Sequence, residues 1–165
     1  MTKLKLAAVF AGLALTACAT PQQYDAANDI HAFLVAVRDG DRDTFEAHVD
    51  RRALRQQLEY RILGELPRDP LLRALGSLVS APVADVATDA LVRPQVFRTV
   101  AIYNGYDPSR PLPRPSVIAQ ALRNAGAGQV CIGERKRPCT LVFAREDGVW
   151  RLVAFEGDLK DLRAS

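Results

Sequence analysis

The spacing of hydrophobic residues changes late in the chain, and this change constrains the fold more than any other feature. Before it, apolar residues recur every three or four positions, which is typical of amphipathic helices. After it, three segments over 129–132, 139–145 and 149–155 have the composition of strands, and Asp147-Gly148 is a strong two-residue hairpin signal. Helices first and strands last predict an α+β fold, with N-terminal and central α-helices packed on a small C-terminal antiparallel sheet of about three strands.

The start and end signals of the first three helices are clear. The first helix is predicted over about 24–38, because Gly40 is suited to end it as a C-terminal cap. Asp41 or Asp43 would cap a short second helix, and Asp50 would cap a third.

Prolines punctuate the middle of the chain. Pro70, Pro82 and Pro94 predict three helix starts, because the first helical turn does not need the backbone N–H that proline lacks. Further on, Ser116 is placed to cap a helix over 117–125.

The two-residue turn also predicts the register of the last hairpin. One face of this hairpin carries most of the apolar bulk, so we assign that face to the core. The other face is too apolar to be fully exposed, which predicts partial cover by another element. The predicted pairs on the core face are Arg145 with Trp150, Phe143 with Leu152, and Leu141 with Ala154.

The first residues form a charged and apolar leader. Lys3 and Lys5 precede an apolar stretch over 6–15, which is too short for a membrane-spanning helix of about 20 residues. Small residues then lead into a cysteine. This stretch, Leu15-Thr16-Ala17-Cys18, resembles the lipobox of bacterial lipoproteins.

The lipoprotein resemblance implies a division of the chain and a location. Residues 1–17 would be a signal peptide removed at the Ala17–Cys18 bond, with diacylglycerol on the Cys18 thiol and an acyl chain such as palmitate on its amino terminus. Residues 18–24 would be a tether and residues 25–165 a single α+β domain. Ala19 after the cysteine implies the outer membrane, with the domain facing the periplasm. The alternative is an ordinary secretory signal in which the cysteine occurs by chance.

The charge balance argues against nucleic acid as a partner. The chain carries a formal net charge of +3, of which Lys3 and Lys5 supply two, so loss of the signal would leave the chain almost neutral. The chain of 165 residues is long enough for one domain with a hydrophobic core. The sequence sets no oligomeric state.

Two further cysteines are available to pair. Cys131 and Cys139 lie eight residues apart, and in an oxidising periplasm a structural disulfide between them is the expected outcome. Two cysteines without a nearby histidine make a poor zinc site, and the C-x-x-C redox spacing does not occur. We therefore predict no metal and no cofactor.

The sequence offers little for catalysis. His31 and His48 are the only histidines, and their spacing does not match a metal or catalytic motif. The chain has no nucleophile elbow, phosphate-binding loop or dinucleotide fingerprint. We predict no catalytic residues, and surface or capping roles for both histidines.

Basic side chains gather at two places. The third helix and the loop between the paired cysteines are both rich in arginine and lysine, which would suit lipid headgroups, lipopolysaccharide phosphates or an acidic protein patch. The alternative is that these side chains are ordinary solvated surface. The candidates for contact with an anionic surface are Arg51, Arg52, Arg55, Arg135, Lys136 and Arg137.

Three passages resemble a bacterial envelope family known only as a domain of unknown function. These are Asp39-Gly40-Asp41 followed by Val49-Asp50, the stretch from Leu78-Val79 to Arg93-Pro94, and the closing Asp147-Gly148 with Trp150-Arg151-Leu152. The family has no established activity, so the resemblance implies none. It is consistent with a non-catalytic, lipid-anchored interaction or binding module of the cell envelope.

A looser resemblance links the chain to the nuclear-transport-factor-like α+β cone. The shared features are Phe33-Leu34-Val35-Ala36 with Gly40-Asp41 near the start and Asp147-Gly148 with Trp150-Arg151-Leu152 near the end. This resemblance implies an alternative function, in which a closed apolar pocket binds or converts a small apolar ligand. That fold carries a longer sheet than this chain supplies.

Overall fold

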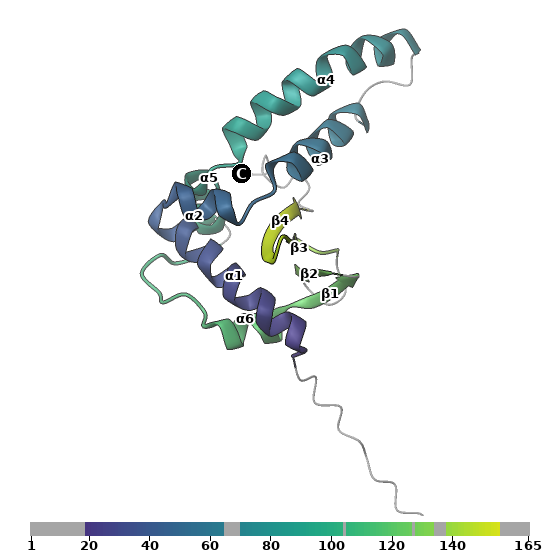
Figure 1. Cartoon of the computed structure of the whole chain (residues 1–165). Helices are drawn as coiled ribbons and strands as arrows, with labels where there is room; N and C mark the ends of the chain where they lie inside the picture. The colour runs from purple at the N-terminus through teal and green to yellow at the C-terminus, as the bar shows by residue number, and fades with distance from the viewer. Residues whose placement is uncertain (1–18, 65–69, 104, 127, 134–137, 156–165) are drawn as a thin grey trace, which may run out of the picture.

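The fold is described from a computed structural model, which defines residues 19–64, 70–103, 105–126, 128–133 and 138–155 (Figure 1). For residues 62–63 and 70–80 it describes the backbone and not the side chains. Helices precede strands throughout the described residues. The elements are α1 (Pro21–Asp39), α2 (Arg42–Ala47), α3 (Arg51–Gly64), α4 (Pro70–Leu91), α5 (Pro94–Tyr103), α6 (Pro115–Ala121), β1 (Arg123–Gly126), β2 (Gln129–Ile132), β3 (Leu141–Glu146) and β4 (Val149–Phe155).

The strands form one antiparallel sheet in the order β1-β2-β3-β4. The predicted α+β class is confirmed, but the sheet has four strands rather than about three. The additional strand, β1, lies where we predicted the second half of a helix over 117–125. That helix, α6, begins at Pro115 after Arg114 rather than after a Ser116 cap, and Leu122 already has an extended backbone. Backbone pairing with β2 decides the conformation of β1, and no local sequence pattern in 123–126 predicts a strand there.

The first helix begins earlier than predicted. Thr20 caps α1, since its hydroxyl accepts from the Gln23 backbone N–H while the Gln23 side chain accepts from the Thr20 backbone N–H. Pro21 supplies a first helical residue with a suitable φ. Residues 21–24, which we had placed in the tether, are therefore the first turn of α1.

The other predicted caps are confirmed. Gly40 ends α1 in the left-handed region, at φ 74°. The Asp41 side chain accepts from two backbone N–H groups at the start of α2. The Asp50 carboxylate accepts from the Ala53 backbone N–H at 3.0 Å, which caps α3.

Only two of the three prolines start helices. Pro70 and Pro94 begin α4 and α5 as predicted, but Pro82 lies inside α4, so the prediction of a helix start there is wrong. A proline inside a helix removes one backbone hydrogen bond. The helix nevertheless continues through Pro82 and lies alongside α3, and the two helices form a hairpin that projects from the rest of the molecule (Figure 1).

The closing hairpin has the predicted turn, and most of its register is as predicted. Asp147 and Gly148 both have positive φ, at 49° and 85°, as a two-residue turn requires. Arg145 faces Trp150 and Phe143 faces Leu152, as expected. An irregularity between Val142 and Phe143 then shifts the register. The third predicted pair is therefore wrong: Leu141 faces Phe155, and Ala154 faces Val142.

Aromatic side chains fill the space between the helices and the sheet. Phe33, Phe45, Phe97 and Phe143 form four ring contacts with centroids between 5.4 and 5.8 Å apart. Phe143, Trp150 and Leu152 are all buried, so the predicted core face of the hairpin is confirmed.

Helix α3 partly covers the end of the last strand. The Gln57 amide donates to the Phe155 carbonyl at 2.8 Å and accepts from its backbone N–H at 3.1 Å. Arg61 donates to the same carbonyl and lies over the Phe155 ring. Among the helices described, none combines the length and hydrophobicity that crossing a bilayer demands.

Candidate functional site

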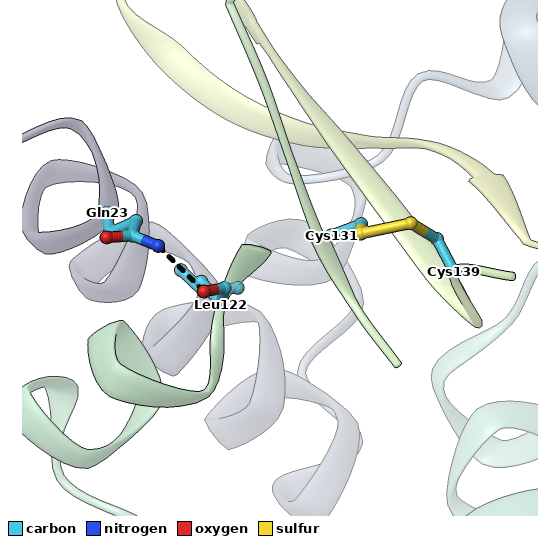
Figure 2. The surroundings of a disulfide bond; sticks show 4 residues. All are labelled: Gln23, Leu122, Cys131 and Cys139. Carbon is cyan, nitrogen blue, oxygen red and sulfur yellow. Dashed lines mark hydrogen bonds between the residues drawn. A yellow bond between two sulfur atoms is a disulfide. The ribbon is translucent and has the colours of Figure 1, made fainter. Parts of the chain in front are cut away.

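The predicted disulfide is present. Cys131 in β2 and Cys139 before β3 are bonded, with their α-carbons 5.7 Å apart (Figure 2). Cys131 is fully buried, so the bond fastens an interior strand to the chain that leads into the next strand. Backbone also approaches closely at Gly133, where a β-carbon would lie 2.9 Å from the carbonyl oxygen of Pro138. Because Cys131 is buried in a strand of the sheet, the disulfide has a structural role.

The basic residues of α3 mostly make internal contacts. Arg51 donates through Nε and Nη2 to the two carboxylate oxygens of Glu46, both at 2.6 Å, and through Nη2 to the Val92 carbonyl at 2.7 Å. Its Nη1 lies 3.4 Å from the Asp89 carboxylate. The two hydrogen bonds from Arg51 to the Glu46 carboxylate lower the pKa of Glu46 below its usual value. Arg51 therefore joins α2, α3 and the end of α4.

The remaining basic candidates differ in their surroundings. Arg55 lies 3.4 Å from the Asp85 carboxylate on α4 and thus repeats the contact between the two helices one turn later. Arg52 is exposed and, within the described part of the chain, forms no ion pair with a carboxylate. The other three candidates, Arg135, Lys136 and Arg137, lie outside the described residues.

Both histidines bond to backbone carbonyls. Nδ1 of His31 lies 3.0 Å from the Pro113 oxygen, and Nδ1 of His48 lies 2.8 Å from the Thr44 oxygen. His31 thus connects α1 to the segment before α6, while His48 ends α2. Across the residues that the structure defines, no three His, Cys, Asp or Glu side chains are grouped so as to hold a metal ion.

A carboxyl pair lies where α3 meets the hairpin. Glu146 lies beside Asp50, and its burial together with this like charge raises its pKa above the usual value. Arg151 approaches Glu146 at 3.8 Å, which opposes that shift. Since Asp50 also caps α3, the pair belongs to the junction between helix and sheet.

The beginning of α1 borders an open hollow of about 450 Å³, which we call the α1 hollow. The start of α1 lies beside α6 and β1, at the end of the molecule opposite the projecting α3–α4 hairpin (Figure 1). The residues that line the hollow come from α1, from the turn between β1 and β2, and from the last hairpin. They are Pro21, Gln22, Asp25, Gly128, Arg145 and Trp150.

Polar contacts organise the α1 hollow. The Asp25 carboxylate accepts from the Trp150 indole N–H at 3.0 Å and lies 3.2 Å from Nη1 of Arg145. One turn along α1, the Asp29 carboxylate accepts from the Trp150 backbone N–H at 2.8 Å. The Gln22 amide nitrogen is buried without a hydrogen-bond partner among the described residues.

Sequence reasoning did not find this site. No site was predicted at Asp25 or Asp29 from the sequence. The available signal was the spacing of Asp25 and Asp29, which places two carboxylates on one helix face four residues apart. Their partner, Trp150, lies more than a hundred residues further along the chain, so spacing alone could not identify it.

The alternative of an apolar ligand pocket gains no support. The space between helices and sheet is filled by the phenylalanine cluster described above, and the α1 hollow is open and partly lined by charged side chains. A ligand site of the predicted kind would be closed and mostly apolar.

Comparison with known proteins gives a family without a function. No match was found among curated proteins, and none among solved structures. One family profile, described as a protein of unknown function (DUF2939), matches residues 13–100. Because this match covers more than half of the 165 residues, the protein belongs to the DUF2939 family.

Proposed function

We propose that this protein is a lipid-anchored, non-catalytic interaction module of the cell envelope. The observation that carries the proposal is the leader that ends in Leu15-Thr16-Ala17-Cys18, with its two lysines and its short apolar stretch. Lipidation of Cys18 would hold the domain at a membrane. The lipoprotein resemblance, with Ala19 directly after the cysteine, favours the outer membrane, with the domain in the periplasm.

The disulfide supports the same compartment. The bond between Cys131 and Cys139 is of the kind that persists in oxidising environments such as the bacterial periplasm and is rare in reducing ones. It joins β2 to the residues that lead into β3.

Two features favour interaction over catalysis. Both histidines are used in contacts with backbone carbonyls. In contrast, Val83 and Val86 on the projecting helix α4 are 49% and 71% exposed, which leaves apolar surface available to a partner. Arg52 is the residue of α3 that we assign to contact with an anionic partner, since Arg51 and Arg55 hold α3 against α2 and α4.

The anchor is tested by Cys18→Ala in the full chain. We expect the wild-type protein to fractionate with membranes and to carry acyl chains at Cys18 by mass spectrometry, and the variant to be released from membranes. The matched control is the Cys131→Ser, Cys139→Ser double variant, which removes both other cysteines and should remain in the membrane fraction. A Cys18→Ala protein that still fractionates with membranes would overturn the proposal.

A further inference from the structure

The connection between Cys18 and the domain is very short. Only Ala19 and Thr20 separate Cys18 from the first residue of α1. Ala19 packs against the hydrophobic core, and Thr20 caps α1. The start of α1 is also fixed to the junction of α6 and β1, because the Gln23 amide donates to the Leu122 carbonyl at 2.7 Å (Figure 2). The chain therefore leaves the domain at a fixed point.

A fixed exit point limits how the domain can turn relative to the membrane. The three residue-to-residue steps from Cys18 to Pro21 span at most about 11 Å when extended. If Cys18 is lipidated, as proposed above, the surface around the start of α1 must lie close to the headgroups. The α3–α4 hairpin lies at the opposite end and would point away from that membrane (Figure 1).

The α1 hollow is part of this membrane-proximal surface, since Pro21 and Gln22 line it. We propose that the α1 hollow binds the zwitterionic headgroup of phosphatidylethanolamine in the membrane that holds Cys18. This inference rests on the proposed lipidation and adds a contact surface and a ligand class.

The charges of the hollow fit such a headgroup. Arg145 is half exposed, and one carboxylate, that of Asp25, is its ion-pair partner among the described residues, so its guanidinium retains donors for a phosphate. Gln22 also borders the hollow, with its amide nitrogen buried and without a hydrogen-bond partner among the described residues. Asp25 is also about half exposed and offers carboxylate oxygen to an ammonium group. The Arg145 guanidinium and the Asp25 carboxylate lie 3.2 Å apart. A headgroup that carries both a phosphate and an ammonium group can contact both side chains.

The hollow contains its own reporter. Trp150 is the single tryptophan of the chain and one of the lining residues. The full, lipidated protein is reconstituted into phosphatidylethanolamine vesicles that contain a phospholipid spin-labelled either at the headgroup or at the end of an acyl chain. We expect the headgroup label to quench Trp150 fluorescence more strongly than the chain-end label.

Two variants test the cause of this preference. Arg145→Glu should abolish the preferential quenching, whereas Arg110→Glu, an equal change of charge at an exposed loop residue, should leave it intact. A flexible glycine-serine spacer inserted between Cys18 and Ala19 leaves every domain residue unchanged and should also reduce the quenching. Equal quenching by the two labels in the wild-type protein, or quenching unaffected by both Arg145→Glu and the spacer, would overturn the inference.

The outcome also separates this inference from the proposed function. Mass spectrometry of the reconstituted protein reports whether Cys18 carries lipid. Absence of lipid overturns the proposed function and the headgroup contact together. A lipidated protein whose Trp150 shows no preference for the headgroup label overturns the headgroup contact alone.

Discussion

The indole N–H of Trp150 in β4 donates a hydrogen bond to the Asp25 carboxylate near the start of α1, at 3.0 Å. The Trp150 backbone N–H donates to Asp29 on the same helix. The last hairpin is thus joined to the first helix through both the side chain and the main chain of one residue. This contact also positions Asp25 beside Arg145 in the α1 hollow.

Removal of the Asp25 carboxylate should destabilise the domain. Asp25→Ala leaves the buried Trp150 indole without its acceptor and removes the partner of Arg145, and an unsatisfied donor of this kind costs about 1–2 kcal/mol. Urea unfolding measures the loss. Asp25→Asn keeps an acceptor and should lose less, while Asn28→Ala, at an exposed position on the same helix, should change stability little. Equal losses for Asp25→Ala and Asn28→Ala would contradict the assigned role.

The two adjacent arginines of α3 should behave differently. Arg51→Ala leaves Glu46 and the Val92 carbonyl without their donor and should reduce the free energy of unfolding by about 1–2 kcal/mol. Arg52→Ala removes an exposed side chain and should stay within about 0.5 kcal/mol of the wild type. Chemical denaturation of the two variants decides the comparison, and a larger effect at Arg52 would refute the structural assignment of Arg51.

Pro82 should be replaceable with a gain in stability. It lies inside α4, where alanine restores a backbone donor and is a better helix former. We therefore expect Pro82→Ala to increase the free energy of unfolding by about 1–3 kcal/mol and to raise the melting temperature. Pro94 is the control, because it is buried at the start of α5, where proline is favourable. Pro94→Ala should be neutral or destabilising. Stabilisation by both variants would show that position in the helix is not the cause.

Reduction of the disulfide should weaken the sheet. In the chain-entropy model a loop as short as that between Cys131 and Cys139 contributes roughly 2–3 kcal/mol. Unfolding in urea with and without a thiol reductant measures this contribution. The Cys131→Ser, Cys139→Ser variant serves as the control, since its stability should not respond to the reductant. Equal stability of the oxidised and reduced wild type would contradict the prediction.

Glu146 should make the domain less stable as pH rises through the acid range. Its pKa is raised in the folded state by burial and by Asp50, so the folded protein holds this proton more tightly than the unfolded chain. The resulting stabilisation is present below the ordinary pKa of glutamate and is lost as pH rises through the raised pKa. Glu146→Gln should therefore remove this loss and gain stability relative to wild type as pH increases.

A second glutamate supplies the opposite sign. The pKa of Glu46 is lowered by its hydrogen bonds to Arg51, so its contribution is present above its ordinary pKa and disappears as pH falls through the lowered value. Glu46→Gln should consequently lose stability at neutral pH. Unfolding curves of the wild type and both variants between about pH 3 and pH 8, a range that includes both carboxyl titrations, give the difference in unfolding free energy between wild type and each variant. As pH rises, this difference should fall for Glu146→Gln and increase for Glu46→Gln. A change of the same sign for both variants would contradict the environments described here.

Features that depend on a few neighbouring residues were predictable. Gly40 ends α1, Asp41 and Asp50 cap the following helices, and Asp147-Gly148 closes the hairpin, because each acts within a few positions along the chain. Local signals were not always sufficient: Pro82 suits a helix start but lies inside α4, and the Thr20 cap of α1 was missed although it is local.

Features that join distant segments were not predictable. The conformation of β1 depends on its pairing with β2, and the register shift near Val142 depends on how β3 and β4 pack. The basic character of α3 was visible, but the partners of Arg51 on α2 and α4 were not, so a side chain that joins three helices resembled a free surface charge.

The sequence by itself determined the α+β class, the caps at Gly40, Asp41 and Asp50, the closing turn, the pairing of the two downstream cysteines and the expectation of a lipid anchor at Cys18. Each of these is encoded by residue type and short spacing. Only the tertiary structure decided the fourth strand and the α1 hollow. The hollow needs Asp25 near the start of the domain and Trp150 near its end to meet, and hydrogen bonds over that separation depend on the packing of the whole chain.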